Sequence, residues 1–509
     1  MPSKGVDFYG FVAKGFELEI RKADAGNKDK PDVVQHISSN SVLRFFSDHY
    51  EINTNAFGLK YEGRFQFIAR KDGRELYERS LRINANTGNI DNEDIGNIRI
   101  PARVENDYCL SFGLYDADSS NPNAHQIYAT LTPNRKTWQS DFFRAVSDSQ
   151  KKTLSDVFLK DIFLPGSHDA GMYTDMLTEA ANMANTQHHN ISKQLELGAR
   201  YFDFRPGKLC KEVVPLLHEV KKHKSKILGP LAFITAGLGF ILDWFLDGKI
   251  NDLVPLFQSK VGKTSHIHAV IPGESYYDFI RETVSFLEKN KEEIVVINIA
   301  DSGILRDFEV PDLPVDVIIE GQKVNGKKVK IVDVPSKAEL EAEIQPLLGS
   351  GIKIGSKASF NKSIRTLLDT HERLIILYRE EGPDTADTYG DDYVSYDKNV
   401  VTKAVKKLLS ENNDSKEMVK LQLQLTPTGV PDGIARAIKG TNKCTTPLYA
   451  TKPRTDLESY RLLLEKADDI KSLKPLTVAQ NDFYDNALTE IAVALNEYKA
   501  GLVSSIRPE

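Results

Sequence analysis

Buried strands that alternate with amphipathic helices after Ser147 constrain the fold of this chain more than any other feature of its sequence. The clearest unit is YYDFIRETVSFLEKNKEEIVVINIAD at 276–301. Its predicted helix places five residues on one face: Phe279, Ile280, Thr283, Val284 and Leu287. An apolar strand follows at 294–299, and similar strands recur at 373–382, near 420 and after 475. This alternation predicts an α/β fold, and six or more strands over more than 300 residues favour a barrel with insertions.

The first 145 residues follow a different pattern. Short runs such as FELEIRK, FQFIARK and CLSFGLYDA alternate apolar and polar residues between clusters of Gly, Asn and Asp. We therefore expect a sandwich-like antiparallel β-domain at 1–145 and an α/β domain at 146–509. The residues leave the role of the β-domain open between an accessory or packing domain and a module that binds lipid or a partner.

Composition narrows the class of protein. The 66 basic and 72 acidic residues among 509 give no net positive charge of the kind that nucleic-acid binding requires. Cys109, Cys210 and Cys444 are odd in number and far apart, so a reducing compartment is the default. No apolar leader follows the N-terminus. We expect a cytoplasmic protein, or one exported without a visible signal peptide.

A His-Asp pair stands out in DIFLPGSHDAGMY at 161–173. The apolar residues 162–164 predict the end of a buried strand, which Pro165 and Gly166 would terminate. His168 and Asp169 then lie on the loop at the carboxyl end of that strand, where α/β enzymes carry catalytic groups. A polar turn is the alternative.

A second pair follows in ARYFDFRPG. Asp203 and Arg205 are two positions apart, so they share one face of a strand. A guanidinium held by a carboxylate is suited to a phosphate, because its fork grips two oxygens. A structural ion pair is the alternative.

These pieces together resemble a known family. LPGSHDAG, QLELGARYFDFRPG, a later His followed by IPGESYYDFIRETVSFLEKNKEEIVVINI, LTPTG and AQNDFYDNALTEIAVALN are similar, in order, to the X-domain of bacterial-type phosphatidylinositol-specific phospholipase C. The resemblance runs from about residue 150 to the C-terminus. It implies a distorted TIM barrel that cleaves the phosphodiester of a phosphatidylinositol-type lipid at a membrane surface, through a cyclic inositol phosphate.

The resemblance also implies roles for individual residues. His168 would be the general base, and His268 in HIHAVIPG the general acid. Arg205 would stabilise charge on phosphorus, with Asp203 orienting it and Asp169 helping to position the site. A late aspartate, Asp482 in AQNDFYD, would hydrogen-bond the base; a helix cap is the alternative for this residue.

Metal use follows from the same comparison. Calcium-dependent relatives are expected to have further acidic ligands where this chain has FDFR. Arg205 instead supplies a fixed positive charge, so we expect a metal-independent enzyme without a cofactor. The assignment of the general acid has alternatives. Ala269 replaces the glycine that usually follows the second histidine of the family, and His266 and His218 are alternatives to His268.

The headgroup is the least determined feature. Inositol-cleaving members carry a lysine after the IVVINI strand, whereas this chain has Ala300 and Asp301. Positions that resemble headgroup contacts are Arg379, Asp391 and Tyr393. A phosphodiesterase for another headgroup is therefore the second interpretation.

An insertion at 211–264 extends the barrel. Its segment 227–246, ILGPLAFITAGLGFILDWFL, is almost wholly apolar, but its glycines, Pro230 and Asp243 argue against a spanning helix. It predicts either a hairpin that enters one leaflet beside basic residues 221–226, giving peripheral membrane association, or a buried hairpin. A non-catalytic protein that binds lipid or inserts into membranes and uses the barrel as a scaffold is the third interpretation.

Overall fold

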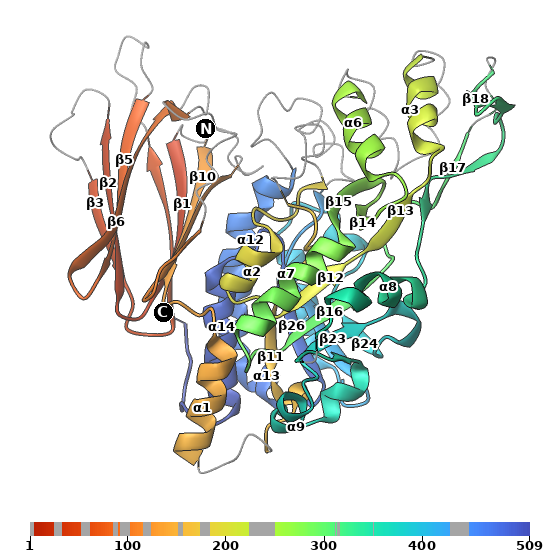
Figure 1. Ribbon diagram of the computed structural model, residues 1–509. Coiled ribbons are helices and arrows are strands. Elements are labelled where there is room, and N and C mark those ends of the chain that lie inside the picture. Colours follow the sequence, from red (N-terminus) through yellow and green to blue (C-terminus); the bar gives the residue numbers. More distant parts are fainter. Residues whose placement is uncertain are drawn as a thin grey trace, which may run out of the picture.

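A computed structural model describes the chain in thirteen stretches: 5–24, 33–51, 62–84, 90–91, 102–115, 124–150, 156–173, 184–222, 250–310, 312, 316–349, 351–427 and 447–508. Two units lie side by side in Figure 1, a β-sandwich coloured red to orange and an α/β unit coloured yellow to blue. Helix α1 (Trp138–Gln150) follows the sandwich in the chain.

Two five-stranded sheets form the sandwich, with strand orders β4-β1-β10-β9-β8 and β3-β2-β5-β6-β7. The strands are β1 (Gly5–Ala13), β2 (Phe16–Asp24), β3 (Val33–Ser38), β4 (Leu43–Glu51), β5 (Glu62–Lys71), β6 (Arg74–Asn84), β7 (Ile90–Asp91), β8 (Arg103–Val104), β9 (Cys109–Tyr115) and β10 (Ala124–Thr132). Aromatic rings fill the space between the sheets: Phe67 of β5 lies 5.6 Å from Phe8 and 5.1 Å from Phe112, between ring centroids. Burial of these rings supplies much of the stabilisation of the sandwich.

One feature of the sandwich differs from the prediction. The sheet from β3 to β7 is antiparallel throughout, as expected, but β1 and β10 pair in parallel. A parallel pair requires a long connection rather than a hairpin, and the rest of the sandwich lies between these two strands in the chain. The domain is therefore mixed rather than purely antiparallel.

An eight-stranded parallel sheet forms the centre of the α/β unit, in the order β22-β23-β16-β12-β11-β26-β25-β24. Its strands are β11 (Phe163–Ser167), β12 (Tyr201–Phe204), β16 (Val295–Ile299), β22 (Ile354–Gly355), β23 (Leu374–Leu377), β24 (Thr385–Asp387), β25 (Met418–Gln422) and β26 (Leu476–Asn481). The sheet is curled into a half-barrel, and no pairing between β22 and β24 closes it within the described stretches.

Helices follow the strands of the half-barrel, as the alternating sequence pattern predicts. They are α2 (Ile191–Glu196), α3 (Val213–Lys222), α6 (Ile250–Lys260), α7 (Tyr276–Lys289), α8 (Lys337–Ile344), α9 (Ile364–Asp369), α10 (Asn399–Ser410), α12 (Pro447–Glu465), α13 (Ala467–Ser472) and α14 (Asn486–Lys499). Helix α7 buries the predicted face, Phe279 and Leu287 included, and its N-cap Ser275 accepts a hydrogen bond from the Asp278 amide.

A small sheet, β15-β14-β13-β21, lies beside the half-barrel. Its strands are β13 (Pro206–Leu209), β14 (Thr264–His268), β15 (Ile271–Ser275) and β21 (Val332–Asp333). Helices α3 and α6 project from this side of the molecule in Figure 1 and flank the predicted apolar segment in the chain. That segment, 227–246, lies outside the described residues. Among the helices that are described, none has the length and hydropathy to cross a membrane.

Strand β11 corrects another prediction. It continues through Pro165 and Gly166 to Ser167 instead of ending at Leu164. The Pro165 carbonyl accepts the Arg200 amide, so the proline still contributes to the ladder. A Cβ at Gly166 would lie 3.0 to 3.2 Å from atoms of the flanking strands, so glycine allows the three strands to approach.

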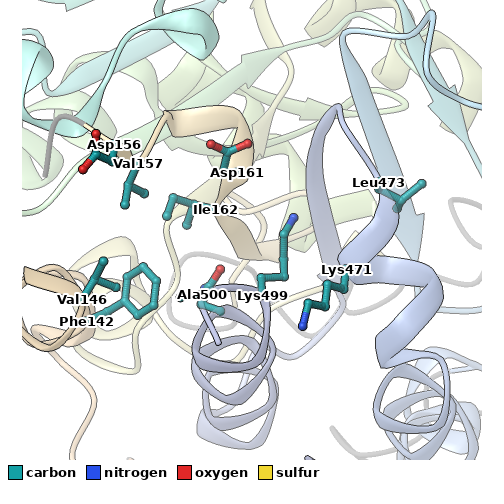
Figure 2. Close-up of a pocket in the computed structure, with 11 residues that line it drawn as sticks. Phe142, Val146, Asp156, Val157, Asp161, Ile162, Lys471, Leu473, Lys499 and Ala500 are labelled. Atoms are coloured by element: carbon teal, nitrogen blue, oxygen red, sulfur yellow. The ribbon is translucent and has the colours of Figure 1, made fainter. Parts of the chain in front are cut away.

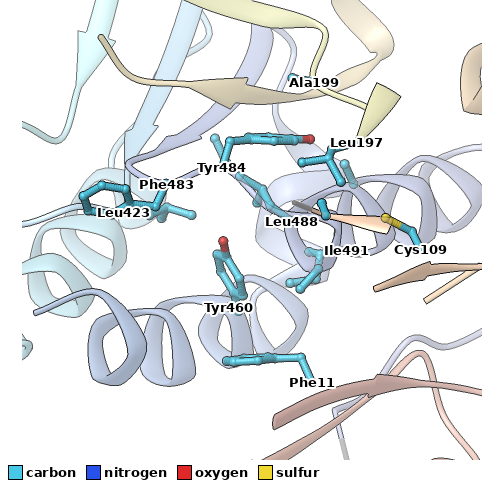
Figure 3. Packing of buried hydrophobic residues seen from close by; sticks show 14 of the residues in the cluster. Phe11, Cys109, Leu197, Ala199, Leu423, Tyr460, Phe483, Tyr484, Leu488 and Ile491 are labelled. Atoms are coloured by element: carbon cyan, nitrogen blue, oxygen red, sulfur yellow. The ribbon is translucent and has the colours of Figure 1, made fainter. Parts of the chain in front are cut away.

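A shared hydrophobic core joins the sandwich to the half-barrel. Helices α12 and α14 pack against β10 and β9. The Phe11 ring of β1 lies 5.7 Å from that of Tyr460 on α12, and Cys109 of β9 faces Ile491 and Leu488 of α14 (Figure 3). Buried residues of the two units therefore belong to one continuous hydrophobic cluster.

Candidate active site

Polar side chains gather at the carboxyl ends of three neighbouring strands. His168 and Asp169 follow β11, Arg205 follows β12, and Asp482 follows β26. The register places Ser167 opposite both Phe202 and Asn481, so the residues after these positions meet at one edge of the sheet. This edge is where parallel α/β enzymes bind their substrates.

His168 is buried and held from both sides of its ring. Its Nδ1 lies 2.7 Å from Asp482 Oδ1, and Arg205 Nη2 lies 3.0 Å from its Nε2. A guanidinium only donates hydrogen bonds, so in the neutral ring Nδ1–H donates to Asp482 and Nε2 accepts. The Gln187 amide also donates to the His168 carbonyl at 2.7 Å. The arrangement leaves Nε2 as the basic nitrogen.

Asp169 connects the charged groups of the cluster. Its Oδ1 lies 2.8 Å from Arg205 Nε and 3.2 Å from His266 Nε2. Its Oδ2 lies 3.6 Å from Nε2 of both His168 and His268, and has no hydrogen-bond partner within the described residues. The Asp169 backbone is left-handed, with φ 43°, which is uncommon outside glycine. A buried carboxylate oxygen without a donor marks a place for a ligand hydroxyl or proton.

The structure separates the three candidate histidines. His266 is fully buried, and both of its nitrogens are used, since Nδ1 accepts the Arg205 amide at 3.3 Å. His268 lies two residues further along β14 with a ring that is 30 % exposed. His218 is exposed on α3. Only His268 combines contact with the cluster and access to solvent.

A glycine after the His-Asp pair makes room for this arrangement. A Cβ at Gly171 would lie 2.6 Å from the Cβ of His266. Side chains cannot approach so closely, so any larger residue at 171 would displace β14. The two glycines that flank His168 and Asp169 therefore serve close packing, Gly166 against the sheet and Gly171 against the second histidine strand.

Arg205 is held in one orientation by two carboxylates. Its side chain is 12 % exposed, and its Nη2 lies 3.2 Å from Asp203 Oδ2 in addition to the contact with Asp169. Asp203 also accepts a hydrogen bond from Asn298 Nδ2 at 3.3 Å. Burial alone would raise the pKa of Asp169, but Arg205 and the neighbouring histidines together outweigh burial and hold this pKa well below its usual range.

The two imidazoles that lie 3.6 Å from Asp169 Oδ2 have opposite pKa shifts. Burial by itself lowers the pKa of His168, but the carboxylates of Asp169 and Asp482 outweigh it and raise the pKa overall. Burial lowers the pKa of His268 to about 4, and Asp169 only partly offsets this effect. Groups with pKa values driven apart in one cluster are typical of acid-base catalysis.

Three of these residues also have the geometry of a metal site. His168, Asp169 and Asp203 offer ligand atoms that all lie within 4.8 Å of one another. Arg205 forms ion pairs with both carboxylates, and a guanidinium repels a cation at close range. The negative charge of the two candidate carboxylate ligands is therefore already balanced by Arg205.

The predicted headgroup residues have different positions. Arg379 Nη1 lies 3.0 Å from Asp301 Oδ2, and Asp301 also pairs with Arg306. Asp391 is exposed. Tyr393 is fully buried, and its hydroxyl donates to the Gln422 carbonyl.

The exposed ring beside Tyr393 is Tyr389. Its side chain is 43 % exposed, and the two ring centroids lie 5.0 Å apart. The pKa of Tyr389 is raised chiefly by burial of its hydroxyl, and Arg205 lies near enough to oppose the shift. Tyr389 is not among the residues predicted from the sequence. Its spacing from Tyr393 gives no signal, because the exposure of one ring and the burial of the other arise only when the loop folds.

No protein-family model and no curated protein sequence matches this chain. Among solved structures, a pentafluoro-Phe-containing phosphatidylinositol-specific phospholipase C from Staphylococcus aureus is 14 % identical, with a TM-score of 0.37, over 69 % of this chain and 98 % of that one. The phosphatidylinositol-specific phospholipase C from Listeria monocytogenes is 13 % identical, with a TM-score of 0.36, over 71 % and 98 % of the two chains.

A separate cavity of about 250 Å³ lies at the opposite end of β11 from His168 (Figure 2). Phe142, Asp161 and Lys499 are among the residues that line it. The Lys499 ammonium is buried without a hydrogen-bond partner among the described residues, and burial lowers its pKa to about 8. This end of the sheet carries none of the candidate catalytic groups.

Proposed function

We propose that this protein cleaves the phosphodiester of a phosphatidylinositol-type lipid at a membrane surface by two-histidine acid-base catalysis, without a metal ion. One observation carries the proposal. Nε2 of His168 and Nε2 of His268 lie at the same 3.6 Å from one oxygen of Asp169, and so at most twice that distance from each other. A phosphate between them meets both rings and the Arg205 guanidinium.

The first step uses a hydroxyl of the substrate itself. His168 takes the proton of the inositol 2-hydroxyl at Nε2 while that oxygen attacks phosphorus. Asp482, at 2.7 Å from Nδ1, holds the ring and stabilises the imidazolium that forms. Arg205, on the same side of His168, stabilises the charge that develops on the phosphoryl oxygens.

The leaving group departs with a proton from His268. The bond between phosphorus and the diacylglycerol oxygen breaks, that oxygen takes the Nε2 proton, and a cyclic inositol phosphate remains. His268 has a pKa of about 4 in the free protein, so it acquires this proton when the substrate anion arrives, since a neighbouring negative charge favours the imidazolium. The reactive form has neutral His168 and charged His268, which predicts a bell-shaped pH–rate profile.

Arg205 supports the metal-independent form of the mechanism. It supplies at the phosphate the positive charge that a hard cation supplies elsewhere, and it forms ion pairs with the carboxylates that a cation would need. Its Nη1, which the contacts with Asp169, Asp203 and His168 do not use, keeps directed N–H donors for phosphate oxygens, which a spherical ion does not have.

The test is phosphorus NMR of the full chain with phosphatidylinositol vesicles, with and without a chelator. We expect a cyclic phosphate signal that survives chelation, disappears in His168→Ala and His268→Ala, and persists in His218→Ala, the exposed histidine of α3. Equal activity of wild type and both site variants would refute two-histidine catalysis.

A second headgroup class is favoured by one observation. Asp301, after β16, is paired with both Arg379 and Arg306, so the position where relatives are expected to carry a free lysine holds a neutralised carboxylate. The same vesicle assay with phosphatidylglycerol or phosphatidylcholine decides between the classes. Vesicle binding that is unchanged in His168→Ala, without cleavage of any of these lipids, would favour the non-catalytic scaffold.

A further inference from the structure

A charged cluster is buried where the sandwich meets the α/β unit. Lys452 and Asp456 of α12 and Asp485 before α14 are at most 4 % exposed. The Lys452 ammonium pairs with Asp456, and lies 3.1 Å from Asp485 Oδ2. The hydroxyl of Tyr128, on β10 of the sandwich, donates to both carboxylates, at 3.1 Å to Asp456 and 2.7 Å to Asp485. The ammonium and the single hydroxyl hydrogen are thus shared between the two buried carboxylates.

Hydrogen bonds connect this cluster to the candidate active site. Asp456 Oδ1 accepts a hydrogen bond from Asn481 Nδ2 at 2.8 Å, and Asn481 Oδ1 accepts the Asp482 amide at 2.9 Å. Asp482 Oδ1 in turn lies 2.7 Å from His168 Nδ1. A continuous series of contacts therefore runs from Tyr128 in the sandwich to the proposed general base.

The series permits one orientation of each member. An Asn side chain has one acceptor and one donor group, and Asn481 uses its donor on Asp456 and its acceptor on Asp482. Tyr460 adds a second acceptor for the same Nδ2 at 3.0 Å. Because the local dielectric is low, a reversed amide would be costly: it would set acceptor against acceptor at Asp456 and donor against donor at the Asp482 amide.

Burial of three charges needs a reason beyond stability. Apolar residues of similar size would pack this interface as well or better, because removing charges from water costs more than their attraction commonly returns. A fixed geometry at the far end of the series is such a reason.

We infer that Tyr128, Asp456 and Asn481 are positioning residues for Asp482, so that the N-terminal sandwich helps to set the geometry of the general base. The kinetic consequence rests on the proposed function, whereas the effect on the His168 ring does not. The sandwich is then a working part of the active centre rather than an appended module.

Two substitutions test the inference from opposite ends. Asp456→Asn keeps the shape of the side chain but replaces one carboxylate oxygen by an NH₂ donor. In the wild type, Oδ2 accepts from Lys452 and Tyr128, and Oδ1 accepts from Asn481. In either orientation the new amide therefore faces another donor, which should displace Asn481 and with it the hydrogen bond to the Asp482 amide. Tyr128→Phe removes one hydroxyl from the sandwich side. Tyr50→Phe is the matched control, since Tyr50 is also buried in the sandwich and its hydroxyl has no partner among the described residues.

The first readout is independent of substrate. In the full chain labelled with ¹⁵N-histidine, the resonance lost in His168→Ala identifies His168, and its titration is followed in each variant. We expect the His168 pKa to fall toward the ordinary histidine value in Asp456→Asn and Tyr128→Phe but not in Tyr50→Phe, because a displaced Asp482 stabilises the imidazolium less. An unchanged titration in both variants would overturn the inference. Should Asp456→Asn fail to fold, Tyr128→Phe decides alone.

The second readout is turnover of phosphatidylinositol vesicles. We expect kcat to fall about tenfold in Asp456→Asn and about threefold in Tyr128→Phe, with KM within about twofold of wild type, as for groups that orient a catalytic ligand. A shifted His168 titration without cleavage by the wild type would retain the positioning role and reject the proposed substrate. Normal kcat in both variants would contradict the inference whatever the substrate.

Discussion

Replacement of Arg205 by lysine removes the fork while keeping the charge. Arg205 reaches Asp169 through Nε at 2.8 Å, and Asp203 and His168 through Nη2 at 3.2 and 3.0 Å. One ammonium does not occupy both positions, so in Arg205→Lys it pairs with one carboxylate and leaves the phosphate with at most one donor. Loss of one donor to a developing oxyanion costs a factor of about 10² to 10³ in kcat, or about 3 kcal/mol.

The matched control is Arg200→Lys. Arg200 is also buried and paired with a carboxylate, Glu293, but donates to backbone carbonyls away from the cluster. Both variants are expected to lose about 1 to 2 kcal/mol of unfolding free energy. Single-turnover cleavage at saturating vesicles, corrected for the folded fraction by guanidinium denaturation, should fall only in Arg205→Lys. A rate within threefold of wild type would refute the role assigned to the fork.

Three further predictions concern metal, pH and backbone strain. Chelation should leave wild-type turnover unchanged. The variant Arg205→Ala should regain part of its lost activity with Ca²⁺, because His168, Asp169 and Asp203 then have room for a cation. Wild-type turnover that falls on chelation would contradict the metal-independent mechanism. Lys499→Met should raise the unfolding free energy by about 2 to 3 kcal/mol below pH 8, because the pKa of Lys499 is about 8 in the folded protein and higher in the unfolded chain. In denaturation at several pH values, this gain should vanish as the pH rises toward the ordinary lysine pKa. A gain that does not change with pH would argue against titration of Lys499 as its cause. Ala269→Gly should raise the free energy of unfolding by up to about 1 kcal/mol, because Ala269 has φ 57° and a left-handed alanine is strained. A lower free energy of unfolding in denaturant titration would mean that the strain is absent.

Local sequence patterns predicted the parts of the site that depend on one strand. Asp203 and Arg205 share a face because a strand alternates with period two, and the His-Asp pair follows β11 because the apolar run before it is buried. The same periodicity could not separate His266 from His268, which point to the same side of β14. The two histidines differ in burial, and this burial depends on Gly171 and on the packing of β14 against β11.

Contacts between distant segments could not be predicted from the residues alone. The parallel pairing of β1 with β10 joins the two ends of the sandwich, and Tyr128 meets Asp456 from more than 300 positions away. Neither contact leaves a periodic signal in the chain. The exposure of Tyr389 and the burial of Tyr393 likewise follow from how the loop after β24 folds onto β25.

The core shared by the sandwich and the half-barrel limits where the chain can be truncated and how its two units can evolve. Phe11 and Cys109 pack directly on α12 and α14, so a cut near residue 145 would strip the cover from the helix that begins beside Asp482. We expect a single calorimetric transition for the two units rather than two. A recombination event that exchanged either half for that of another protein would succeed only if it also carried the matching apolar face, so the two halves are constrained to change together.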